Sequence, residues 1–181
     1  MEVGIRPTIR TEEPSDYSVV FTVIEKSFAN VEHSDHREQF LVERLRKSTA
    51  FVPELALVAE VDGEIIGYIL LTKIQIKSER ESTTSLALAP VAVLPTYQGK
   101  GVGGQLIEAA HERAKGLGFA AVVLLGHEDY YPRFGYKSAK AYGIELPFDV
   151  PDENCMAIEL VEGALSKVNG VVEYPTAFNN Y

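Results

Sequence analysis

Gln98-Gly99-Lys100-Gly101-Val102-Gly103-Gly104 is the stretch that decides the fold, because it joins a strand-like run, residues 86–93, to a helix-like one, residues 102–117. Backbone N–H groups in the first turn of a helix have no partner inside the helix, and the helix dipole makes this end positive. An anion such as phosphate is stabilised there, and glycines allow the backbone to come close to it. Four glycines in six residues therefore favour phosphate binding over an ordinary flexible turn.

The stretch does not fit the Walker phosphate loop. That loop needs a glycine, four residues, Gly-Lys and then Ser or Thr for magnesium. Here Gly99-Lys100 is followed by Gly101, and neither Pro95 nor Thr96 supplies the first glycine.

The dinucleotide fingerprint G-x-G-x-x-G is formally matched by Gly99, Gly101 and Gly104, and Glu128 follows the next strand-like run. In that fold the first glycine lies directly after the strand, whereas five residues intervene here. The chain after Gly126 also lacks a long amphipathic helix. A dinucleotide-binding module is therefore kept as the more distant alternative.

The segment from Val93 to Gly103 resembles the pyrophosphate motif of the GNAT acetyltransferases, whose core is Gln or Arg, two residues, Gly, one residue, and Gly or Ala. Gln98, Gly101 and Gly103 occupy those positions. The resemblance implies that acetyl-CoA is the cofactor and that the backbone of the preceding strand pairs with the pantetheine amides. The implied cofactor-binding residues are Ala92, Val93, Gln98, Gly99, Lys100, Gly101, Val102, Gly103 and Gly104.

A second motif follows downstream, in residues 126–136, which look like the fourth-helix segment of that family. Tyr131 stands four residues before the pair Gly135-Tyr136, as the catalytic tyrosine of the family does. The resemblance implies that Tyr131 is the general acid, although a packed aromatic and an exchange of roles with Tyr130 remain alternatives. The tail, residues 147–160, is similar to the YhbS-like branch of the family.

The pattern of apolar residues predicts an α/β fold with a mixed, mostly antiparallel central sheet flanked by helices on both faces, as in the GNAT acyl-CoA N-acyltransferases. Helices are expected near residues 14–28 and 35–47, the second capped by Ser34 or Asp35, and again after the glycine loop. A hairpin is expected at Asp62-Gly63, with further strands at residues 85–93 and 120–125.

Composition sets the remaining bounds. The 181 residues, 46% of them hydrophobic and without a Pro/Gly/Ser-rich linker, predict one domain over residues 1–181. A net charge of -9 argues against nucleic acid and favours cationic acceptors. No signal peptide and no apolar run of ~20 residues is found, which predicts a cytoplasmic protein without a membrane partner. A homodimer stays open.

The predicted reaction is direct transfer of an acetyl group to a primary amine, carried by a small molecule or a peptide, in a ternary complex. The single cysteine, Cys155, has no histidine nearby in the sequence and is expected to be a buried thiol. His33 and His36 have metal-compatible spacing without a third ligand, so no metal is expected. His127 either faces the cofactor or caps a turn. The alternative function is a non-catalytic domain that binds or senses acyl-CoA.

Overall fold

The computed structural model describes residues 4–179 and contains nine strands in one sheet. Three α-helices and several short 3-10 helices connect them. In chain order the elements that matter below are β1 (Thr8–Thr11), α1 (Tyr17–Phe28), α2 (Glu38–Arg46), β2 (Phe51–Val61), β3 (Glu64–Lys77), β4 (Ser82–Val93), α3 (Val102–Gly116), β5 (Ala121–Leu125), η3 (Tyr131–Phe134), β6 (Lys137–Ser138), β7 (Ile144–Glu145), β8 (Cys155–Glu159), β9 (Gly170–Glu173) and η6 (Thr176–Asn179).

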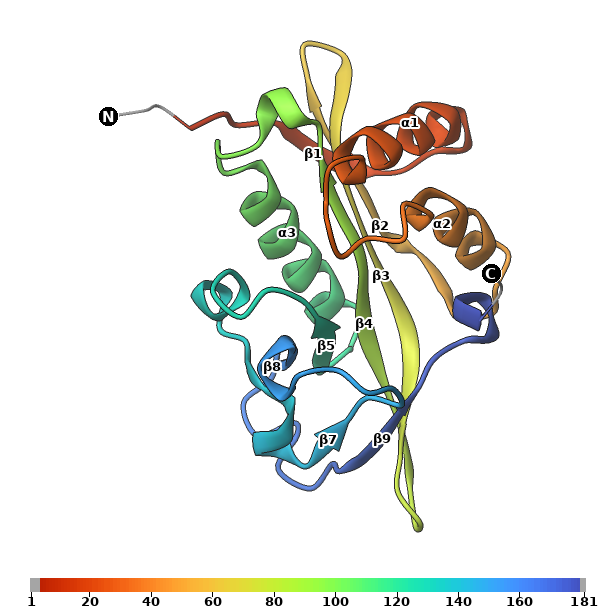
Figure 1. Ribbon diagram of the computed structural model, residues 1–181, viewed down its shortest axis with the longest axis vertical. Coiled ribbons are helices and arrows are strands. Elements are labelled where there is room, and N and C mark those ends of the chain that lie inside the picture. Colours follow the sequence, from red (N-terminus) through yellow and green to blue (C-terminus); the bar gives the residue numbers. More distant parts are fainter. Residues whose placement is uncertain (1–3, 180–181) are drawn as a thin grey trace.

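The sheet is mostly antiparallel and has the order β1-β2-β3-β4-β5-β8-β6, with β9 pairing both β3 and β7. The parallel pairs are β4 with β5 and β7 with β9. As Figure 1 shows, α3 covers one face of the sheet, and α1 and α2 cover the other. The predicted fold class is confirmed.

Alternation along the central strands explains why both faces are covered. In β2, Leu55, Leu57 and Ala59 pack in the cluster that includes α3, whereas Ala56 and Val58 pack in the cluster that includes α1 and α2. Successive side chains of a strand point to opposite faces, so a strand apolar at every position needs a helix on each side.

The hairpin and the third helix follow the sequence closely. Asp62 and Gly63 both have positive φ, 51° and 79°, as the two-residue turn between β2 and β3 requires. In α3 the buried residues recur at helical spacing: Val102, Leu106, Ile107, Ala110 and Ala114.

Two local expectations were wrong. Ser34 and Asp35 do not cap α2, because Ser34 Oγ accepts the His36 N–H at 2.8 Å and Asp35 Oδ1 accepts the Arg37 N–H at 2.9 Å, both before the helix. These side chains stabilise the loop between α1 and α2 instead. The expected fourth helix is only the 3-10 turn η3, which has proline near its start and ends at a left-handed glycine.

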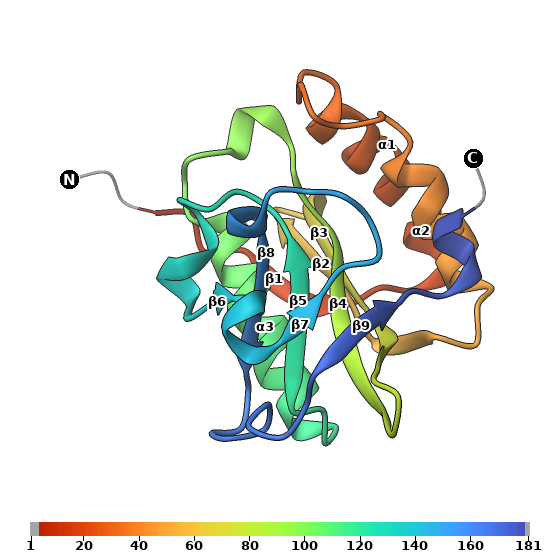
Figure 2. The same ribbon diagram turned by 60° about the horizontal axis from the view of Figure 1, so that its bottom comes forward.

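The parallel strands β4 and β5 separate soon after they pair. Their register joins Leu86 to Val122 and Ala87 to Val123, yet β4 continues to Val93. A bulge in β4, between the positions opposite Ile69 and Leu71, bends the strand at this point. Figure 2 shows β5 between β4 and β8. The diverging strands leave one side of β4 without a neighbouring strand, just before the glycine loop.

This topology does not support the dinucleotide-binding alternative. That fold joins several parallel strands through successive β-α-β units. Among the described residues, α3 connects one parallel pair, β4 with β5, and the other parallel pair, β7 with β9, consists of short strands. Among residues 4–179, no helix has the length and apolar character needed to cross a membrane.

Candidate active site

The loop between β4 and α3 takes its shape from two glycines. Gly99 has a φ of 75° and Gly101 a φ of 84°, a region that costs residues with a Cβ about 1–2 kcal/mol. The Gly101 carbonyl accepts the Gln105 N–H at 3.2 Å. The N–H groups of residues 102–104 therefore lie outside the intrahelical ladder, at the positive end of the helix, and can bind an anion.

Gly103 and Gly104 serve a different purpose, because they let the segment after β5 pack against the first turn of α3. A Cβ on Gly103 would lie 3.0 Å from Tyr130 Oη, and one on Gly104 would lie 3.2 Å from the Phe134 ring. The Tyr130 hydroxyl is thus close to the helix N-terminus. Together with the backbone N–H groups and the exposed Lys100 beside them, it makes a donor set that fits a pyrophosphate.

The side chain of Gln98 acts on the strand in this structure. Its Nε2 donates to the Val93 carbonyl at 2.9 Å, which ties the loop back to the end of β4. The backbone of Lys100 has a partner in the N-terminal segment, since its carbonyl accepts the Ile5 N–H at 3.3 Å. Gln105 Nε2 donates to the Ile5 carbonyl at 2.7 Å. The N-terminal segment at Ile5 therefore stabilises the glycine loop through two hydrogen bonds.

The backbone of Ala92 faces β3 and not the opening between β4 and β5. Leu94 N–H donates to the Ile66 carbonyl at 2.9 Å, and Ala92 pairs with Tyr68 two residues further along each strand. Hydrogen-bonded pairs recur at every second residue of an antiparallel ladder. The N–H and C=O of Ala92 therefore form hydrogen bonds with β3. This geometry does not favour the predicted binding of pantetheine by the Ala92 backbone.

Val91 and Val93, on the same argument, direct their backbone groups into the opening. Val93 N–H donates to Ser27 Oγ of α1 at 3.0 Å, and the Val93 carbonyl accepts from Gln98. Within residues 4–179 no such partner is found for Val91. Sequence reasoning missed both Val91 and Ser27, because only the register between β4 and β3 shows which residues of β4 face the opening.

Tyr131 is almost fully buried at the end of β5. Its ring fills the space beside Gly126, where a Cβ would come within 2.4 Å of it. Burial raises the pKa of Tyr131 to about 12, with a smaller contribution from the neighbouring Tyr130. Among the described residues its hydroxyl has no hydrogen-bond partner. A hydroxyl that stays protonated and has no competing acceptor is suited to donate a proton to a ligand.

Tyr131 is positioned by a cluster of rings. The rings of Tyr130 and Tyr131 meet edge to face with centroids 5.0 Å apart, and Tyr136 lies 5.8 Å away on the other side. Tyr136 Oη is hydrogen-bonded to His111 Nε2 of α3 at 2.7 Å. Burial lowers the pKa of His111 to about 4, so this histidine is neutral and fixes Tyr136 rather than carrying charge.

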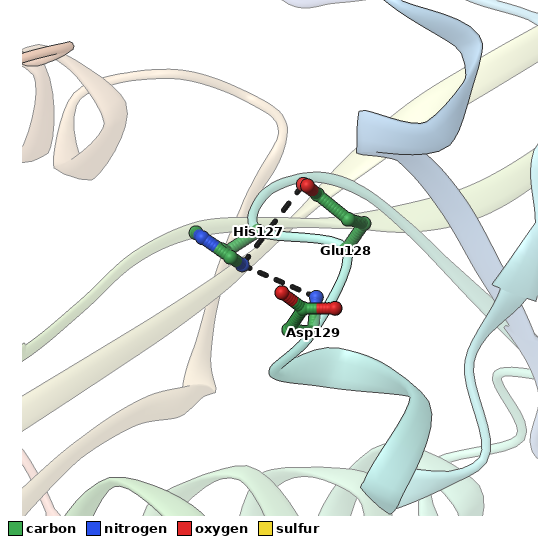
Figure 3. Close-up of side chains that lie close together, drawn as sticks. All are labelled: His127, Glu128 and Asp129. Carbon is green, nitrogen blue, oxygen red and sulfur yellow. Dashed lines mark hydrogen bonds and ion pairs between the residues drawn. The ribbon is translucent and has the colours of Figure 1, made fainter.

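His127 caps the turn that follows β5, which is one of the two roles foreseen for it. Its Nδ1 accepts the Asp129 N–H at 3.1 Å and lies 3.9 Å from Glu128 Oε2 (Figure 3). Glu128 Oε2 in turn accepts from Asn154 Nδ2 at 2.9 Å. The ligand atoms of residues 127–129 lie within 4.8 Å of one another. They are exposed and two of them already have partners, so this group does not resemble a built metal site.

Cys155 is buried on β8, as expected from the sequence. Burial is the largest cause that raises the pKa of its thiol, and Asp152 and Glu153 raise it further. Its Sγ donates weakly to the Pro151 carbonyl at 3.7 Å. A protonated, shielded thiol is a poor nucleophile.

A pocket of about 810 Å³ opens on the side of β4 that faces α1 and α2. It reaches the bulge of β4 at residues 88–90 and the end of β5 at Leu125. Residues 27–47 contribute Phe28, Glu38 and Leu41 to its lining. The C-terminal segments contribute much of the opposite wall, including Phe148, Val172, Tyr174 and Phe178. Sequence reasoning missed that wall, because no motif marks it.

Proteins of known sequence are similar to this chain over most of their length. Residues 25–136 match the family model described as the acetyltransferase (GNAT) family. N-acetyltransferase YjhQ of Escherichia coli K12 is 36% identical over 148 residues, which are 81% of this chain and 79% of YjhQ. N-acetyltransferase YhbS of the same strain is 32% identical over 174 residues, which are 96% of this chain and 99% of YhbS. Both relatives are described as uncharacterized.

Two solved structures are similar to this chain over nearly its whole length. The crystal structure of Escherichia coli YhbS in complex with CoA has a TM-score of 0.87 at 28% identity and covers 100% of this chain and 96% of that one. A GNAT acetyltransferase from Brucella melitensis in complex with acetyl-CoA has a TM-score of 0.78 at 31% identity, covering 96% of this chain and 98% of that one. The resemblance carried by the two motifs is confirmed, and the chain belongs to the GNAT acetyltransferase family.

Proposed function

We propose that this chain transfers the acetyl group of acetyl-CoA to a primary amine by direct attack in a ternary complex. One continuous arrangement supports this proposal. The glycine loop follows the open side of β4, Tyr130 touches the loop across Gly103, Tyr131 packs on Tyr130, and the pocket reaches the same part of β4. Anion binding, proton donation and acceptor binding would thus occur along one path.

Each residue has a physical role in this path. The N-terminus of α3 and Lys100 hold the pyrophosphate. The backbone of Val91 orients the pantetheine arm, whereas the N–H and C=O of Val93 already bond to Ser27 and Gln98. Acetyl-CoA supplies an acetyl group activated as a thioester. The Val91 N–H faces the opening, where it stabilises the negative charge that develops on the carbonyl oxygen.

The transfer balances without an enzyme nucleophile. The amine first gives the extra proton of its ammonium form to water. Its neutral nitrogen then bonds to the carbonyl carbon, the carbon–sulfur bond breaks, and Tyr131 donates its proton to the departing thiolate. The proton lost by the nitrogen passes to water, because His127 Nδ1 is engaged with the Asp129 N–H. Tyr131 is then reprotonated from solvent. No metal takes part in this scheme.

The proposed setting follows from the same properties. The acceptor is a small-molecule or peptide amine, and the net charge of -9 disfavours nucleic acid and anionic membrane surfaces. We propose the cytoplasm as the compartment, in keeping with a single unpaired cysteine. We propose one domain over residues 1–181. Homodimer formation stays an open prediction.

The second candidate, a domain that senses acyl-CoA without catalysis, shares the cofactor site but needs no proton donor. A screen of amines, polyamines, aminoglycosides and peptide N-termini, with free coenzyme A thiol as the readout, separates the two. Amine-dependent thiol release supports the transferase. Cofactor binding without release by any acceptor class would favour the sensor.

Acetyl-CoA should stabilise the folded protein, because its pyrophosphate completes the N-terminus of α3. At a hundredfold excess over the dissociation constant the expected gain is about 2.7 kcal/mol, measured by denaturant or thermal unfolding. NAD at equal concentration serves as the control and should give no gain. Stabilisation by NAD alone would contradict the proposal.

Replacing Cys155 by alanine should leave most of the activity, because a buried thiol with a raised pKa is not the nucleophile. The measurement is kcat with a verified acceptor. Mass spectrometry of the wild-type protein incubated with acetyl-CoA alone provides an independent check. A stoichiometric acetyl group on Cys155 that an amine removes would establish the covalent route instead.

A further inference from the structure

The pocket beside β4 has an uneven charge distribution. At one end Lys77 Nζ and Glu173 Oε2 form an ion pair at 2.8 Å, so their charges offset each other. Glu38, in the first turn of α2, also lines the pocket. Its Oε1 accepts a hydrogen bond from Ser34 Oγ, whereas its Oε2 is shielded from water and has no hydrogen-bond partner among residues 4–179.

A shielded carboxylate oxygen without a partner is costly, and a donor that reaches it recovers the lost interaction. Gln39, the next residue, is buried and does not line the pocket. Among the described residues, the unsatisfied acceptor of α2 at this pocket is Glu38 Oε2. The start of α2 therefore suits a ligand that brings N–H donors and positive charge, such as an ammonium group. To bind it, the Glu38 carboxylate turns toward the pocket.

Most of the rest of the lining is apolar or aromatic, apart from Asn179. Phe148 stacks on Tyr174 with centroids 5.6 Å apart, and Tyr174 meets Phe178 at 4.9 Å. Leu125 and Phe148 are 47% and 49% exposed and both line the pocket, so a ligand bound there would cover apolar surface. The volume of about 810 Å³ lies in the range of small-molecule sites.

We infer that the acceptor is a singly charged primary amine on an apolar body, and that Glu38 determines this specificity by binding its ammonium group. This inference rests on the proposed function and names its substrate class. One uncompensated carboxylate matches one positive charge. Among the described residues of the lining, the other carboxylate is that of Glu173, which already pairs with Lys77, so the further charges of a polyamine or an aminoglycoside find no second free carboxylate there.

Calorimetric titration of the protein saturated with coenzyme A tests this inference without requiring turnover. The probes are 2-phenylethylamine, its uncharged counterpart 2-phenylethanol, and spermidine. We expect 2-phenylethylamine to bind most tightly, and the Glu38→Gln variant to weaken it at least tenfold while binding 2-phenylethanol as the wild type does. Glu43→Gln is the matched control, because Glu43 is exposed on the same helix and lies outside this pocket.

Equal affinity of wild type and Glu38→Gln for 2-phenylethylamine would overturn the inference, as would tighter binding of spermidine or no binding of either amine. Stabilisation of Glu38→Gln by coenzyme A shows that the variant is folded, and the comparison of amine with alcohol in the wild type needs no variant. If the amine binds through Glu38 but is never acetylated, the inference stands and the proposed transfer fails. If other amines are acetylated with no dependence on Glu38, the transfer stands and the inference fails.

Discussion

Replacing Tyr131 by phenylalanine should lower kcat roughly a hundredfold or more, in the usual range for a lost acid–base group, while the affinity for acetyl-CoA changes little. The ring and its packing against Gly126, Tyr130 and Tyr136 are kept. The hydroxyl has no partner among residues 4–179, so its removal leaves no group unsatisfied and the stability should stay the same. Steady-state kinetics with a verified acceptor and thermal unfolding measure both effects.

Tyr130→Phe is the matched control, and the structure makes its expected outcome different. The Tyr130 hydroxyl lies beside Gly103 at the start of α3, so its loss should raise the KM for acetyl-CoA a few-fold and leave kcat nearly unchanged. If Tyr130→Phe loses kcat and Tyr131→Phe does not, the two tyrosines exchange roles. If neither loses kcat, water protonates the thiolate.

The raised pKa of Tyr131 also predicts a pH profile. With its pKa at about 12, the acid stays protonated throughout the neutral and mildly alkaline range. At saturating substrates kcat should therefore show no descending limb below about pH 10, the ordinary pKa of a tyrosine. A free thiol has a pKa of about 8.5, well below that of Tyr131, which disfavours proton transfer from Tyr131 to the thiolate. Burial reduces this difference, because it also raises the pKa of a thiol bound beside Tyr131.

Local and periodic signals were sufficient for the scaffold. The Asp62-Gly63 turn, the apolar positions of α3 and the glycine loop depend on backbone conformation or on burial that repeats along one element, and such signals are present in the sequence itself. The Tyr131 spacing belongs to the same class. These features carried the fold and the family.

The remaining features depend on which distant segments meet. Ala92 and Val91 look alike as apolar strand residues, and only the register with β3 shows which of them faces the opening. Glu38 reads as an ordinary exposed helix carboxylate until the C-terminal segments place an aromatic wall near it. His111 gave no signal because its partner, Tyr136, is 25 residues away in the chain. No periodicity encodes such pairings.

Gly103→Glu should abolish the stabilisation by acetyl-CoA, with a loss of affinity of at least a hundredfold. The new side chain starts 3.0 Å from Tyr130 Oη and puts a negative charge at the end of α3 that the pyrophosphate needs. Two like charges about 4 Å apart near a protein surface repel by roughly 4 kcal/mol, which exceeds the 2.7 kcal/mol of a hundredfold change. Calorimetric titration with acetyl-CoA measures the affinity.

Two further variants separate the causes. Gly103→Gln has the same bulk without the charge, so it should lose part of the affinity by displacing Tyr130 and retain more than Gly103→Glu does. Gly116→Glu puts the same side chain at the opposite end of α3, where a Cβ meets nothing within 4 Å. The helix dipole disfavours this charge by about 0.3–1 kcal/mol, which the higher helix propensity of glutamate over glycine offsets. The stability should therefore change little and acetyl-CoA binding should be unchanged. Equal binding by Gly103→Glu and Gly116→Glu would mean that the pyrophosphate does not lie at the N-terminus of α3.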